Sequence, residues 1–239
     1  MVNKASIDGL AAIKVEAAPL RSKIIESIRH AVEQGILKPG DRLIEKDLCQ
    51  QLGVSRTSLR EALRELESEG IIANVSARGL TVVKISYHDA LNIYRIRAQI
   101  EALIFEQFTE NASDIQLANL QPVFEELIAA YQKGQFLLIS QAKARWDSYI
   151  CDVAENLVAG KILSRLTLRT SQLRSRSIVR AERQTQSIKE LQALMKAIQS
   201  RNVKLAADNA RRHVMSAAAS ALIFVEDDHD KKVELNIKN

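Results

Sequence analysis

Apolar residues in the stretch from 44 to 70 recur at helical spacing in two series, with a glycine between them. The first series is Ile44, Leu48 and Leu52. The second series, spaced i, i+3, i+4 and i+7, is Leu59, Ala62, Leu63 and Leu66. Gly53 permits the positive φ that ends a helix, and Ser55 is a favourable cap for the next helix. The pattern predicts a helix-turn-helix whose second helix is the recognition helix.

Two short runs that follow this motif have the composition of strands. Residues 71–75 and 80–85 are rich in β-branched side chains, with a polar stretch between them. We expect a hairpin here, and a third short strand at Arg42. A helix-turn-helix that continues into a hairpin is a winged helix. Arg78 at its tip is placed to enter a minor groove, and Gly79 allows close approach of the backbone.

The polar side of the second helix carries charges in two series. Arg56, Arg60 and Arg64 step by four along one flank, and three glutamates do so along the next. The first turn, residues 55–58, presents hydroxyls, backbone N–H groups and a guanidinium, which suit phosphate oxygens and guanine edges. A solvated charge stripe has the same spacing, but the hairpin that follows favours DNA binding.

These motifs resemble a known family. PGDRLIEKDLCQQLGVSRTSLREALRELESEGII, with ARG in the wing, is similar to the DNA-binding domain of GntR-type bacterial transcription regulators, over about residues 20–85. The resemblance implies operator contacts at Lys46, Ser55, Arg56, Thr57, Arg60, Arg78 and Gly79. Ser58 stands where many relatives have proline. Serine is also acceptable in a first turn, so Ser58 is included in the predicted DNA-binding set.

The rest of the chain has a helical pattern, with no convincing strand. The predicted helices are residues 89–110, 113–133, 136–154, 157–183, 185–200 and 203–224. Short polar breaks between them predict an antiparallel bundle. The predicted fold class is therefore mainly α, an N-terminal winged helix-turn-helix followed by an antiparallel all-α helical bundle. The predicted divisions are an arm (1–18), the DNA-binding domain (19–85), the helical effector and dimerisation domain (89–225) and a polar tail (226–239).

Composition fits this picture. Hydrophobic residues make up 46% and aromatic residues 4% of the chain, which favours a mostly helical protein with a full core. The net charge of +5 suits an anionic partner such as DNA. Cys49 and Cys151 lack metal-ligand spacing, and we interpret both as small buried residues in a reducing cytosol. The longest apolar run, 217–225, is too short to cross a bilayer, and the N-terminal stretch lacks a signal peptide's apolar run. We expect a cytoplasmic protein without a membrane partner.

The helical half resembles the effector domain of the FadR-type subfamily, called the FCD domain. The likeness rests on Asp89, the segment IYRIRAQIEAL with Tyr94, Arg97 and Glu101, Asn156, the segment around Glu190, and ADNARRHV. It implies that this half binds a small ligand, commonly a carboxylate, and supplies dimer contacts.

Many relatives also hold a metal with an Asp and three His. The matching positions here are Lys143, Asp147, Leu191 and His213, of which only His213 keeps its residue type. Asp147 and His213 alone offer too few donors, and the Lys143 ammonium would repel a cation. We predict no bound metal and no cofactor.

The same positions suggest a pocket for an anion. The predicted effector-binding residues are Arg97, Lys143, Asp147 and His213. The alternative is that Lys143 and Asp147, one turn apart, pair only with each other, and that Arg97 pairs with Glu101. The basic run 161–183 is either a solvated face or a surface for an anionic ligand or DNA.

Together these patterns predict a ligand-responsive transcription regulator that is not an enzyme. We expect a homodimer on a short inverted repeat of double-stranded DNA, acting as a repressor and modulated by a small anionic metabolite. One alternative is an effector-independent DNA-binding protein with a closed pocket. Another is an enzyme acting on a small acid, with the winged helix as a docking module, although the helical half shows no catalytic set.

Overall fold

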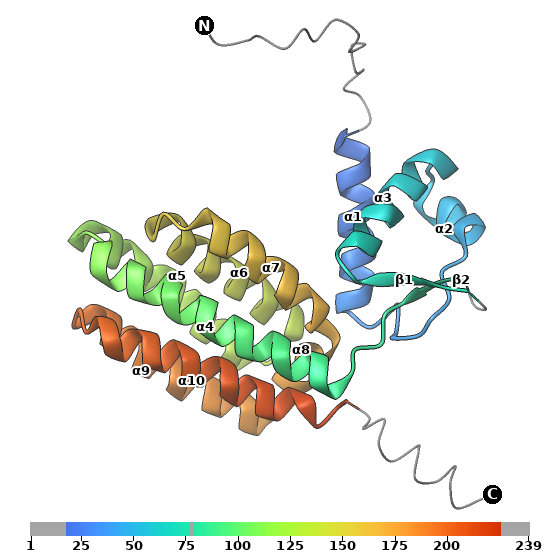
Figure 1. Cartoon of the computed structure of the whole chain (residues 1–239). Helices are drawn as coiled ribbons and strands as arrows, with labels where there is room; N and C mark the ends of the chain where they lie inside the picture. The colour runs from blue at the N-terminus through green and yellow to red at the C-terminus, as the bar shows by residue number, and fades with distance from the viewer. Residues whose placement is uncertain (1–17, 77–78, 226–239) are drawn as a thin grey trace, which may run out of the picture.

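The computed structural model describes residues 18–76 and 79–225 as two units joined by a short connection (Figure 1). The first unit contains α1 (Ala18–Glu33), α2 (Glu45–Leu52), α3 (Arg56–Ser68), β1 (Ile72–Val75) and β2 (Gly79–Val82). The second contains α4 (Tyr87–Asn111), α5 (Asp114–Lys133), α6 (Phe136–Val153), α7 (Leu157–Arg169), α8 (Ser171–Ile178), α9 (Ala181–Gln199) and α10 (Val203–Leu222). The predicted fold class is confirmed. Nearly all of the predicted arm and the whole predicted tail lie outside the described residues.

The helix-turn-helix forms where the apolar pattern places it. Gly53 adopts φ 64° after α2, and Ser55 caps α3 by accepting a hydrogen bond from the Ser58 N–H at 3.2 Å. The apolar series of α3 is buried against α1 and α2: Leu59, Ala62, Leu63 and Leu66. This burial fixes the opposite, polar side of α3 towards solvent, which is the side a recognition helix needs.

The wing is an antiparallel hairpin with one added bridge. Ile72 pairs with Val82 in its register, and Arg42 bridges to Thr81, as expected for the third short strand. The second strand ends at Val82, three residues earlier than predicted. The register would place residue 84 opposite Gly70, but Gly70 has φ 71° and its N–H bonds to the carbonyl of Glu67 in the turn after α3. The ladder therefore cannot continue along this partner beyond Val83.

The bundle has one helix more than predicted, because the run 157–183 divides at Thr170. This residue is fully buried, and its hydroxyl donates to the carbonyl of Thr167 at 3.3 Å. A threonine hydroxyl that bonds to a preceding carbonyl competes with the helical ladder, which accounts for the break between α7 and α8. The largest core side chain, Trp146, is fully buried between Phe105 and Phe124 at centroid distances of 6.0 and 5.8 Å.

The two units share core and hydrogen bonds at α7 and α8. Leu168 of α7 is part of the apolar core of the first unit. One turn later, Gln172 Nε2 donates to the carbonyl of Leu37 at 2.8 Å. The helical bundle therefore contacts the DNA-binding unit through packed side chains as well as through the connection before α4.

Candidate functional sites

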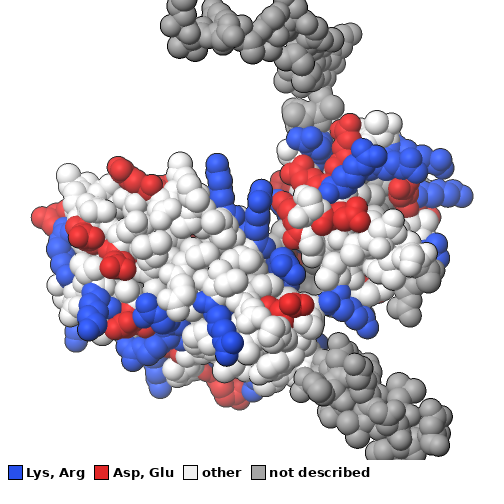
Figure 2. Space-filling model, viewed as in Figure 1, with Lys and Arg blue, Asp and Glu red and all other residues white. Residues whose placement is uncertain are grey.

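The first candidate site is the solvent-facing surface of α2 and α3. Lys46, Ser55, Arg56 and Thr57 are all exposed there, and basic side chains gather on this face (Figure 2). The Ser55 hydroxyl, which caps α3 by accepting from the Ser58 N–H, also lies 3.0 Å from the Ser58 hydroxyl. The N-terminus of a helix suits phosphate oxygens, because its first N–H groups have no partner within the helix.

Arg60 is held by an ion pair that the sequence analysis did not anticipate. Its Nε donates to both carboxylate oxygens of Glu45, at 2.9 and 3.1 Å, from the start of α2. Arg60 remains more than half exposed, with 61% of its side-chain surface accessible. To read a base edge, its guanidinium must share or leave Glu45. Gly79 begins β2 with φ 72°, and Arg78 lies outside the described residues.

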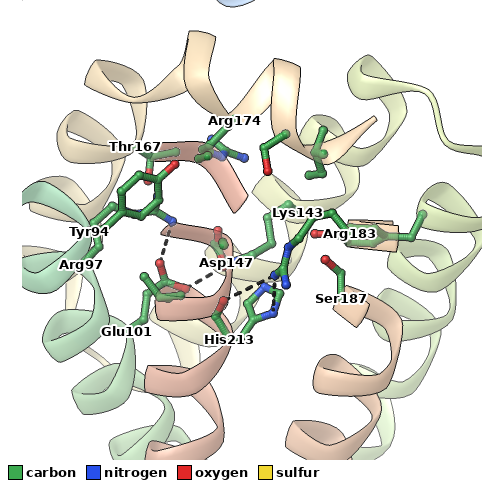
Figure 3. A pocket seen from close by; sticks show the side chains of 16 residues that line it. Tyr94, Arg97, Glu101, Lys143, Asp147, Thr167, Arg174, Arg183, Ser187 and His213 are labelled. Atoms are coloured by element: carbon green, nitrogen blue, oxygen red, sulfur yellow. Dashed lines mark hydrogen bonds and ion pairs between the residues drawn. The ribbon is translucent and has the colours of Figure 1, made fainter. Parts of the chain in front are cut away.

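The second candidate site is a small polar cavity inside the bundle. It has a volume of about 50 Å³, and each helix from α4 to α10 contributes to its lining. Figure 3 shows the charged side chains gathered around it. The lining residues are Tyr94, Arg97, Glu101, Tyr131, Lys143, Asp147, Thr167, Arg174, Ser177, Ile178, Arg183, Ser187, His213, Val214, Ala217 and Ala221. A volume of this size holds water molecules, but not a metabolite, unless side chains move.

Paired charges fill one side of the cavity. Arg97 Nη2 donates to Glu101 Oε1 at 2.9 Å, while Lys143 Nζ lies 3.7 Å from Glu101 Oε2 and donates to Asp147. The Arg97 guanidinium lies over the Tyr94 ring, and its Nε and Nη1 have no hydrogen-bond partner in the described part of the chain. Burial alone would lower the pKa of Lys143, but Asp147 and Glu101 raise it above its usual range. The ammonium therefore stays charged.

A second cluster faces it across the cavity. Glu190 accepts from Arg183 Nη2 at 3.0 Å and from His213 Nδ1 at 2.8 Å. Burial alone would raise the pKa of Glu190, but hydrogen bonds from His213 and Arg183 more than offset it and lower the pKa to about 2. Burial, with the cations Arg183 and Lys143, lowers the pKa of His213 below its ordinary value. His213 is thus a neutral donor at neutral pH.

The structure brings all four predicted effector residues to this cavity. It also forms the two alternative pairs, Lys143 with Asp147 and Arg97 with Glu101, so pairing and pocket lining occur together. The cavity is narrow, as the closed-pocket alternative expects, yet its lining is charged rather than apolar.

Sequence reasoning missed part of the charged lining. The additional charged residues at or beside the cavity are Arg174, Arg183 and Glu190. The basic run 161–183 divides, since Arg174 and Arg183 turn inward while the others are exposed: Lys161, Arg165, Arg169, Arg176 and Arg180. Arg174 and Arg183 are nine residues apart and lie on different helices. A helical pattern read along the sequence therefore does not predict that both side chains point into the same cavity.

The donor set does not suit the metal that the resemblance implies. Leu191 is fully buried in the apolar core, and Lys143 occupies the space between two carboxylates. Within residues 18–76 and 79–225, no group of three or more His, Cys, Asp or Glu side chains could hold a metal ion. An ammonium next to the available carboxylates repels a divalent cation, so no step is assigned to a metal here.

Comparison with known proteins decides the family. The model of the FCD domain matches residues 92–216, and the model described as "Bacterial regulatory proteins, gntR family" matches residues 20–82. The chain belongs to the GntR family of bacterial regulators and carries an FCD domain. The winged unit and the bundle are thus its GntR and FCD parts.

Relatives of this GntR chain are named as regulators. It is 36% identical over 121 residues to the HTH-type transcriptional regulator McbR of Escherichia coli (strain K12), covering 51% of this chain and 55% of McbR. It is 30% identical over 116 residues to the uncharacterized regulator YdhC of Bacillus subtilis (strain 168), covering 48% and 52%. The chain thus spans about half the length of the curated relatives it matches.

The fold has a solved counterpart as well. The structure of E. coli McbR/YncC matches with a TM-score of 0.73 at 25% identity, over 84% of this chain and 96% of that one. No helix of the GntR chain's described residues is long and apolar enough to span a membrane.

Proposed function

We propose that this chain is a ligand-responsive transcription regulator that binds a short inverted repeat of double-stranded DNA as a homodimer. The observation that carries the proposal is the first turn of α3, where Arg56 and Thr57 are exposed beside the Ser55 cap. A helix N-terminus with a guanidinium and hydroxyls suits both phosphates and guanine. Two-fold symmetry of the protein would require two-fold symmetry of the operator.

Within this proposal the residues divide by role. Arg56 and Arg60 read base edges, and Glu45 holds Arg60 in place until DNA competes for it. Lys46, Ser55 and Thr57 position the phosphate backbone, with Ser58 completing the cap, while Gly79 and Arg78 of the wing serve a minor groove. We assign DNA binding to residues 19–85, and effector binding and dimer contacts to residues 89–225.

Selection from a random-sequence DNA library tests the DNA-binding part. The account predicts enrichment of one short inverted repeat bound by two chains. Binding of all sequences with equal affinity, or enrichment of a half-site bound by one chain, contradicts it. With that operator placed before a reporter gene, we expect the protein to lower expression, in accord with a repressor.

The FCD part would respond to a small organic acid. The cavity is lined by two carboxylates and by four cations, which are Arg97, Lys143, Arg174 and Arg183. Arg174 forms no hydrogen bond or ion pair through its side chain with the described residues, and Arg97 has unused donors. A carboxylate entering here gains charge-assisted hydrogen bonds. The two DNA-binding units of a dimer can take different arrangements, and the acid binds these with different affinities. The difference between these affinities sets the size of the response.

A thermal-shift series tests the effector part, since a ligand that binds only the folded state raises the melting temperature. The probes are acetate, lactate, succinate, citrate, gluconate and benzoate, each with and without zinc. We expect at least one acid to stabilise the wild type, and Arg174→Gln to lose this effect. Stabilisation by zinc alone would contradict the metal-free pocket.

The narrow volume favours a second candidate, an effector-independent DNA-binding protein. In that case every acid leaves the melting temperature unchanged, although the DNA selection succeeds.

A further inference from the structure

A much larger cavity lies between the two units. This interdomain cleft has a volume of about 660 Å³, roughly thirteen times that of the bundle cavity. Helices α6, α7 and α8 form one wall, and α1 with the end of α3 forms the other. Basic side chains border the gap in the space-filling view (Figure 2). Metabolite pockets typically measure about 300–1,000 Å³, so the cleft has room where the bundle cavity does not.

The cleft and the bundle cavity meet at shared residues. Lys143, Asp147, Thr167 and Arg174 line both. A molecule in the cleft therefore reaches the same ammonium and guanidinium that line the inner cavity.

The far wall of the cleft offers complementary polar groups from the DNA-binding unit. Glu69, at the end of α3, has only 9% of its side-chain surface exposed, and its Oε2 has no hydrogen-bond partner in the described part of the chain. Its other oxygen accepts from Arg29 of α1, whose Nε is also buried without a partner among the described residues. An unpartnered buried carboxylate oxygen is costly, and a hydroxyl or ammonium group of a ligand would satisfy it.

Arg174 also connects the two walls electrostatically. Burial raises the pKa of Glu33 on α1, and the strongest opposing effect is the charge of Arg174. Arg174 of α8 therefore acts on a carboxylate of the DNA-binding unit, in α1, the helix that packs directly on α3.

We propose that the effector occupies the interdomain cleft, with its carboxylate at Lys143 and Arg174 and a hydrogen-bond donor at Glu69. This inference rests on the proposed regulator function and specifies its ligand as a hydroxylated or amino-bearing organic acid too large for the bundle cavity. Since the ligand touches both units, its binding sets their relative position and thereby the spacing of two recognition helices in a dimer.

Filling the cleft tests this arrangement. Ala144 of α6 is exposed and lines the cleft, while Ala118 of α5 is exposed on a helix that does not. We expect Ala144→Trp to weaken gluconate or citrate binding by about tenfold or more in isothermal titration, because the indole occupies part of the ligand volume. Ala118→Trp should bind within about twofold of wild type, as an equally exposed helical substitution. Ser164→Trp on α7 is a second cleft-filling variant, in case Ala144→Trp unfolds.

The outcomes separate this inference from the function it rests on. If both cleft variants bind the acids as wild type does while Arg174→Gln loses binding, the cleft is wrong and the bundle pocket stands. If Arg174→Gln also binds normally, or none of the acids binds the wild type, both fail. The DNA selection is independent of these results and tests the regulator assignment alone.

Discussion

The Nδ1 atom of His213 lies 2.8 Å from Oε2 of Glu190, which places a neutral imidazole against an ionised carboxylate. Arg183 binds the same carboxylate. The cluster therefore contributes to stability in a way that depends on the protonation of Glu190 and His213.

Acid should weaken this cluster in a defined pH range. The folded-state pKa of Glu190 is about 2, below its ordinary value of 4.5, so its contribution is complete above pH 4.5 and is lost as the pH falls towards 2. His213 acts in the same direction, since its lowered pKa makes the folded state resist protonation below its ordinary 6.5. Urea midpoints of wild type and Glu190→Gln should differ at pH 6 and converge towards pH 2. A difference that stays constant across this range would contradict the assignment.

Lys143 should stabilise the fold by neutralising two carboxylates. Lys143→Met leaves Glu101 and Asp147 without their shared cation, and we expect a loss of about 3 kcal/mol, the low end for breaking a buried pair. Asp147→Asn alone should cost less, because 29% of the Asp147 side chain is exposed. In a double-mutant cycle measured by urea unfolding, the double variant should lose less stability than the two single variants lose in total. Strict additivity would show that the pair is not coupled.

Replacement by glycine should have different effects on stability at two non-glycine residues with positive φ. Glu155 and Arg201 both have φ 53° at helix ends. Glu155 has no side-chain hydrogen bond or ion pair with the described residues, so Glu155→Gly should add about 0.5–1 kcal/mol by relieving left-handed strain. Arg201 donates to the carbonyl of Ala112 at 2.6 Å and to Asp114 at 2.8 Å, and Arg201→Gly loses these bonds. Calorimetry should show a higher melting temperature for the first variant and no increase for the second.

The winged helix followed from the sequence because each of its signals is local. Gly53, Ser55 and the apolar series around them fix two helices and their turn without information from elsewhere in the chain. The Glu45–Arg60 pair was not predicted, since the fold joins residues fifteen positions apart on different helices. The break at Thr170 was also missed, because a helical pattern continues across it and only burial of the hydroxyl shows the competition.

The effector site was predicted only in part for a similar reason. Arg97, Lys143, Asp147 and His213 came from positions shared with a family, and they do meet at one cavity. Arg174 and Arg183 lie in a basic run whose spacing fits a solvated face as well as a lining. Which arginines turn inward depends on how α8 and α9 pack against the other helices. No fixed spacing of residues in a single sequence predicts this packing.

The most direct test of the account is the affinity of the selected operator for Arg56→Ala, with Arg64→Ala as the matched control. Both arginines are exposed on α3, but Arg56 lies in its first turn and Arg64 lies two turns further along. By fluorescence anisotropy at fixed salt, Arg56→Ala should lose about 1–3 kcal/mol of binding and show weaker sequence preference. Arg64→Ala should lose less and keep the preference. Equal affinity and preference for wild type and Arg56→Ala would contradict the claim that the first turn of α3 reads the operator.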